Sequence, residues 1–171
     1  MMKIIQLAYA KDDKFISGEP SFKGEFLYIM DIGGLLRNEP SLELYQKISP
    51  LIPLWIDSAP RKYEDVMDIV VAGAAKVTIR REIFKDNLES LFKEIEVEFY
   101  EGVDIENCTR PIGKWKGRVV YVSEKPSFEE KEKLAFIASK FPTYVVLKER
   151  NLVDLEWMKE IGVEGVILHE R

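Results

Sequence analysis

The chain has 171 residues, of which 46% are hydrophobic and 32% are charged, and its formal net charge is −5. This length predicts one globular domain over residues 1–171, and an acidic balance without a basic stripe argues against a nucleic-acid partner. No apolar run approaches the roughly 20 residues of a membrane span, and no leader pattern precedes the first strand, so no membrane partner is expected. The single cysteine, Cys108, allows no internal disulfide and favours a cytoplasmic location.

Eight short apolar runs have the length and composition of strands. In chain order they are Lys3–Ala10, Glu25–Met30, Pro53–Ile56, Lys76–Ile79, Glu96–Tyr100, Arg118–Val122, Thr143–Leu147 and Gly165–Leu168. Phe15 and Ile16 fit a short second arm that returns after the first strand. The few Gln and Asn beside many Glu and Lys are typical of a thermophile.

Five segments with helical spacing alternate with these strands. They cover residues 41–47, residues from 62 to the cap at 72–74, residues 84–95, a segment that opens at 126–127, and residues 152–161. Ser41 is a suitable N-cap for the first of them, and Gly73 suits the C-terminal cap of the second. No helical period fits residues 11–25 or 102–117, and Gly33-Gly34 is expected to form a turn.

The organising stretch is Pro53–Arg80, which has the pattern strand, helix, strand. Such a unit is right-handed and implies a parallel sheet. Eight strands and five helices fit either a trimmed (β/α)8 TIM barrel that lacks its first, fifth and eighth helices, or an open doubly wound sheet. A closed barrel usually needs about 200 residues or more, so the two architectures remain alternatives at this point.

The same stretch, PLWIDSAPRKYEDVMDIVVAGAAKVTIR, resembles the third strand, third helix and fourth strand of the histidine-biosynthesis (β/α)8 barrels. These are the phosphoribosylformimino-aminoimidazole carboxamide ribotide isomerase and its cyclase sister. KIIQLAYAKDDKF is similar to the family's first strand and turn, FLYIMDIGG to its second strand, and VDLEWMKEIGVEGVILHER to its seventh helix and eighth strand. The resemblance implies a closed barrel and a sugar-phosphate isomerase ancestry.

The family's active positions carry other residues here. Tyr9 occupies the place of the first catalytic aspartate, and Tyr100 with Glu101 lies nearest the second. The glycines that let backbone N–H groups surround a phosphate are replaced at four strand ends. The replacing residues are Asp57-Ser58-Ala59, Arg80-Arg81, Leu147-Lys148 and His169.

Barrel chemistry lies at the carboxyl ends of the strands, which supplies the candidate site residues. Asp31 and Asp57 end neighbouring strands, and two carboxylates in one cleft can serve as catalytic acid and base. The competing interpretation is that Asp57 caps the following helix or pairs with Arg61. The candidate ligand-binding residues are Tyr9, Arg61, Arg80, Glu101, Lys148 and His169. No metal-ligand spacing or cofactor motif is found, so neither a metal nor a cofactor is expected.

Two functional hypotheses follow. The first is an isomerase or lyase that acts on a small phosphorylated or anionic metabolite, with Arg61 or Arg80 as the anion anchor. The second is a non-catalytic barrel that serves as a binding or assembly subunit. Without the first and eighth helices, an apolar strip across strands eight, one and two would lie bare. We therefore expect residues 11–25 to cover part of this strip and a second copy to cover the rest in a homodimer.

Overall fold

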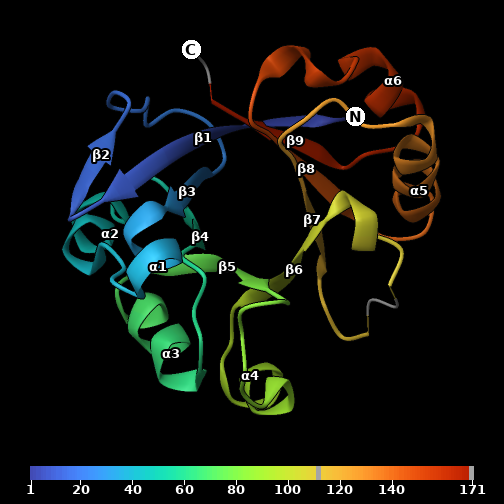
Figure 1. The fold of residues 1–171 in the computed structure, drawn as a ribbon. Helices are drawn as coiled ribbons and strands as arrows, with labels where there is room; N and C mark the ends of the chain where they lie inside the picture. The colour runs from blue at the N-terminus through green and yellow to red at the C-terminus, as the bar shows by residue number, and fades with distance from the viewer. Residues whose placement is uncertain (111–112, 170–171) are drawn as a thin grey trace.

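The described residues form a closed barrel of eight parallel strands (Figure 1). The computed structural model describes residues 1–110 and 113–169. The strands follow one another around the ring as β1 (Lys3–Lys11), β3 (Leu27–Asp31), β4 (Leu54–Asp57), β5 (Ala74–Arg80), β6 (Glu98–Asp104), β7 (Gly117–Val122), β8 (Thr143–Leu147) and β9 (Gly165–Leu168). The ring closes where β9 pairs in parallel with β1, with Lys3 opposite Gly165 and Gln6 opposite Leu168. The barrel is therefore confirmed and the open sheet is wrong.

In the part of the chain that the structure describes, six short helices lie outside the ring (Figure 1). They are α1 (Ile32–Arg37), α2 (Leu42–Ile48), α3 (Tyr63–Val71), α4 (Leu88–Glu94), α5 (Phe128–Ala138) and α6 (Leu155–Glu160). A strand, β2 (Lys14–Ile16), replaces a helix after β1 and pairs with it antiparallel. In the described residues the crossover after β6 holds only a short 3-10 helix, Ile105–Asn107, and no helix follows β9. The expected absence of the first, fifth and eighth helices of the barrel is thus confirmed within that part of the chain. No described helix is long and apolar enough to cross a membrane.

The turn expected at Gly33-Gly34 is wrong, because both glycines lie inside α1. Asp31 caps this helix by accepting a hydrogen bond from the Gly34 backbone N–H at 3.1 Å. A Cβ on Gly34 would lie 2.4 Å from the Ser58 carbonyl oxygen, so glycine lets α1 approach the loop after β4. A six-residue helix with two glycines shows too little periodicity to be recognised in the sequence.

The barrel interior is filled by aromatic side chains rather than being hollow. The Trp55 ring lies 5.1 Å from that of Tyr28, 4.3 Å from Tyr100 and 4.8 Å from Tyr144 between centroids. At the amino end of the strands, the Lys76 ammonium donates to the Tyr100 hydroxyl at 3.1 Å and lies over the same rings. Desolvation by burial lowers the pKa of Lys76. This packing closes the barrel core below the carboxyl ends of the strands.

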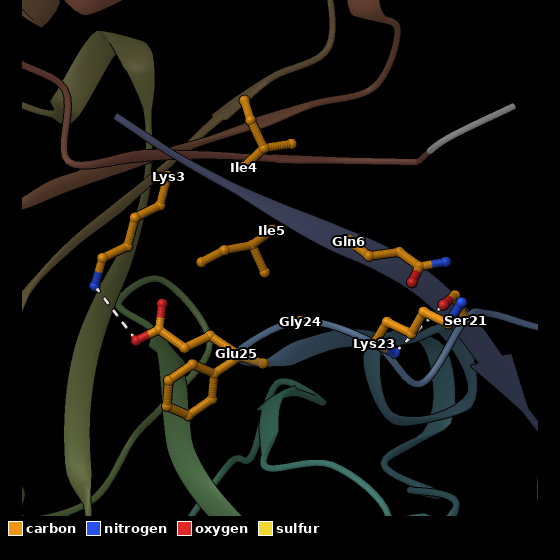
Figure 2. Close-up of a pocket in the computed structure, with 9 residues that line it drawn as sticks. Lys3, Ile4, Ile5, Gln6, Ser21, Lys23, Gly24 and Glu25 are labelled. Carbon is orange, nitrogen blue, oxygen red and sulfur yellow. Dashed lines mark hydrogen bonds and ion pairs between the residues drawn. The ribbon is translucent and has the colours of Figure 1, made fainter. Parts of the chain in front are cut away.

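Residues 11–25 lie against the outside of the barrel, as expected from the missing first helix. Phe15 and Phe22 pack on the outer core cluster that contains Ala8 and Ala10 of β1. Further along β1 the segment leaves a cavity of about 440 Å³, which Lys3 crosses to reach Glu25 at 3.9 Å (Figure 2). The bare apolar strip is narrower than expected. Val166 and Leu168 of β9 are buried, and Ile4 is the one large hydrophobic side chain exposed on the described residues of β9, β1 and β3.

Candidate functional site

A cavity of about 350 Å³ opens at the carboxyl ends of the barrel strands. Its lining comes from most sides of the ring: Tyr9, Met30, Leu35, Arg80, Asp104, Tyr121, Val122, Ser123, Val146 and Lys148. Two smaller hollows of about 220 and 190 Å³ adjoin it, and both share Asp104 and Tyr121 with it. Catalytic and binding sites of TIM barrels lie at this end, which makes this mouth the candidate site.

Asp57 lies beneath the mouth, fully buried inside the ring. Its side chain accepts hydrogen bonds from the hydroxyls of Tyr28 at 2.8 Å and Tyr121 at 2.6 Å. Arg80 donates two more, from Nε at 2.9 Å and from Nη2 at 3.0 Å. Three of these four donors reach Oδ2 and one reaches Oδ1, so both carboxylate oxygens are already hydrogen-bonded within the protein. Of the two competing roles, an ion pair is correct, but the partner is Arg80 and not Arg61.

Burial and the neighbouring charges shift the pKa values of the groups around Asp57. Burial alone would lower the pKa of Arg80, but the adjacent Asp57 carboxylate raises it above its ordinary value. Burial and the same carboxylate raise the pKa of Tyr28, and burial is the largest cause of the raised pKa of Tyr121. Both hydroxyls therefore remain protonated donors. The guanidinium also stacks on the Tyr121 ring, 4.1 Å from its centroid.

Lys148 and Tyr9 present polar groups to the cavity above this cluster. The Lys148 backbone N–H donates to the Val122 carbonyl at 3.1 Å, which fixes the start of its side chain at the rim. No carboxylate in residues 1–110 and 113–169 lies within ion-pair distance of its ammonium. The Tyr9 ring lies 5.4 Å from that of His169, and burial raises the pKa of Tyr9. Lys148 is thus a cation that a ligand can reach.

The expected pairing of Asp31 with Asp57 is wrong, because the two side chains lie on opposite sides of the barrel wall. Asp31 alternates outward on β3, where it accepts from the backbone N–H groups of Gly34 and Ser41 at 3.1 and 2.7 Å. It also accepts from the Tyr45 hydroxyl of α2. Asp31 therefore fastens α1 and α2 to the barrel and does not face the mouth.

Arg61 and Glu101 also lie outside the mouth. Arg61 donates to the carbonyl oxygens of Gly34 at 2.6 Å and Leu35 at 2.9 Å, which binds it to the end of α1. Glu101 points outward from β6 and is 2% exposed. It pairs with buried Arg118, whose Nε donates at 3.0 Å, and with Arg81 at 3.8 Å. These residues stabilise the outer layer of the barrel.

Asp104 and Ser123 line the mouth but were not among the sequence candidates. The expected fifth strand ends at Tyr100, whereas β6 continues to Asp104 and carries the strand end four residues further. The sequence did contain a signal for the longer strand, because Tyr100, Gly102 and Asp104 continue its alternation of inward-facing residues. The glycine in the middle of this run hid it.

The comparisons with known proteins leave the family open. No protein-family model matches the chain, and no curated protein is significantly similar to it. The resemblance to the histidine-biosynthesis barrels therefore stays a prediction. Within the described residues no group of three or more His, Cys, Asp or Glu side chains is placed to hold a metal ion.

Proposed function

We propose that this barrel binds a small phosphorylated or carboxylated metabolite at its mouth and does not catalyse an isomerisation. The observation that carries this proposal is Lys148, a cation without an ion-pair partner among the described residues, at the rim of a 350 Å³ cavity. Tyr9 and Ser123 line the same cavity and supply hydroxyls that can donate to an anion. The volume suits a small metabolite.

The state of Asp57 supports binding over proton transfer. A catalytic base must accept a proton from the substrate within hydrogen-bond reach. Asp57 is buried and already accepts four hydrogen bonds, two of them from Arg80. Protonating it would leave the guanidinium beside it without a counter-ion. Asp31, the other expected member of the pair, lies on the outer side of the wall. Because the phosphate-binding glycines of the sugar-phosphate isomerases are replaced in this chain, the resemblance does not choose between a phosphate and a carboxylate.

Calorimetric titration with propyl phosphate tests the proposal. Binding should be measurable to the native chain, and Lys148→Gln should weaken it by about 10- to 100-fold, the usual effect of losing a charge-assisted contact. Lys159→Gln is the matched control, since it removes an exposed lysine of α6 that lines none of the mouth hollows. The proposal fails if neither propyl phosphate nor propionate binds, or if Lys148→Gln binds as well as the native chain.

A homodimer through the outer face of β9, β1 and β3 stays a prediction, as do the cytoplasmic location and the thermophilic source. Exposed Ile4 beside the cavity of Figure 2 is the feature that supports a second copy there. Sedimentation equilibrium of the native chain and of Ile4→Asp tests it. The prediction is supported if the native chain is a dimer and Ile4→Asp is a monomer. It is contradicted if the native chain is a monomer at a concentration of about 100 μM.

A further inference from the structure

Among the described residues that line the mouth cavity, Lys148 and Asp104 are charged and have no ion-pair partner, whereas Arg80 pairs with Asp57. Asp104 ends β6 and Lys148 follows β8, with β7 between them. Asp104 is level with Tyr121, and Tyr121 is level with Val146, two residues before Lys148. With strands about 4.8 Å apart, their Cα atoms lie at least about 10 Å from each other across the cavity. Both side chains are exposed and line the same space.

Within residues 1–110 and 113–169, the Asp104 side chain makes no hydrogen bond or ion pair that would explain its position. It precedes the 3-10 helix Ile105–Asn107 but makes no capping hydrogen bond. It forms no ion pair in the described part of the chain, although Lys125 lines one of the adjoining hollows with it. Arg80 pairs with Asp57 and Arg110 pairs with Glu82 at 2.9 Å. Asp104 also borders both adjoining hollows and is exposed.

A ligand that is only an anion would meet Lys148 favourably and Asp104 unfavourably. Because both charges border one cavity, a bound phosphate is attracted by the first and repelled by the second. A ligand that also carries an ammonium group satisfies both. The wall between them includes Tyr121 and Val146, which offers a short hydrocarbon chain an apolar surface.

We infer that the ligand is dipolar: its anionic group binds Lys148, and an ammonium group about three to four bonds away binds Asp104. This inference rests on the proposed binding function and narrows it to aminated phosphates or aminated acids. Arg80, held by Asp57, forms the fixed floor between the two ends.

A matched pair of probes tests it by calorimetric titration. 3-Aminopropyl phosphate and propyl phosphate share the anionic group and the chain, and they differ in the ammonium. The native chain should bind the aminated probe about tenfold more tightly, which corresponds to one charge-assisted hydrogen bond. Asp104→Asn should remove this preference while leaving propyl phosphate binding equal or stronger. Glu132→Gln, at an exposed position of α5, is the control of equal charge change and should keep the preference.

The outcomes separate this inference from the function on which it rests. If propyl phosphate binds and loses affinity in Lys148→Gln, but the two probes bind the native chain equally, the dipolar ligand is refuted and the anion site stands. If Asp104→Asn keeps the preference, the ammonium binds elsewhere and the inference is again refuted. If neither probe binds, both the function and the inference fail.

Discussion

Asp57→Asn should destabilise the barrel strongly although it changes only one atom. In either orientation of the new amide, an N–H₂ group replaces an oxygen that accepts from Arg80. At the Oδ2 position it would face three donors, from Arg80, Tyr28 and Tyr121. Removing one partner of a buried ion pair costs about 3–5 kcal/mol. Because the Arg80 side chain is 20% exposed, we discount this to about 2–4 kcal/mol.

Urea unfolding followed by circular dichroism measures this loss, and a double-mutant cycle identifies its cause. Arg80→Met removes the cation that Asp57→Asn leaves without a counter-ion. The double variant should therefore be more stable than the sum of the two single losses predicts, by about 1–3 kcal/mol. The reasoning is refuted if Asp57→Asn unfolds within about 0.5 kcal/mol of the native chain, or if the two losses simply add.

Three further predictions concern the outer layer. Gly34→Ala should cost about 1–3 kcal/mol in urea unfolding, because its Cβ would lie 2.4 Å from the Ser58 carbonyl oxygen, and an unchanged midpoint would contradict the close approach. Burial raises the pKa of the Cys108 thiol to about 11. Iodoacetamide should therefore label the native chain at pH 8 far more slowly than the urea-unfolded chain, and equal rates would refute its burial. Since the folded pKa exceeds the unfolded one, this thiol's contribution to stability should be complete below about pH 9 and decline up to about pH 11.

The strand order could be predicted because apolar runs and punctuating residues mark parallel strands clearly. Thr143–Leu147 and Gly165–Leu168 end where the sequence predicts. The short helices were harder. Residues 84–95 shrink to Leu88–Glu94, because Asn87 caps the helix through the Ser90 backbone N–H at 3.3 Å. The cap sets the first residue of the helix, although the apolar pattern in the sequence begins before it.

The site was predicted only in part, because a strand end does not reveal which side of the wall its last residue faces. Asp31 and Asp57 both end strands, but β3 finishes on an outward position and β4 on an inward one. A strand end predicted to within one residue would have shown that these two aspartates face opposite sides of the wall, because successive residues of a strand alternate between the two faces. Tyr28 and Tyr121 could not be identified from the sequence as partners of Asp57. Hydrogen bonds across a barrel depend on how far each side chain reaches, and the spacing of residues in the sequence does not show this.

The aromatic filling of the barrel gives the mouth a single entrance. Trp55, Tyr28, Tyr100 and Tyr144 block any passage toward the amino ends of the strands. A ligand that binds at the mouth, as proposed, would have to leave by the route that it entered, past the rim residues after β6, β7 and β8. Entry and exit would then share one barrier, so mutations that only narrow or widen the rim should change the association and dissociation rates by the same factor.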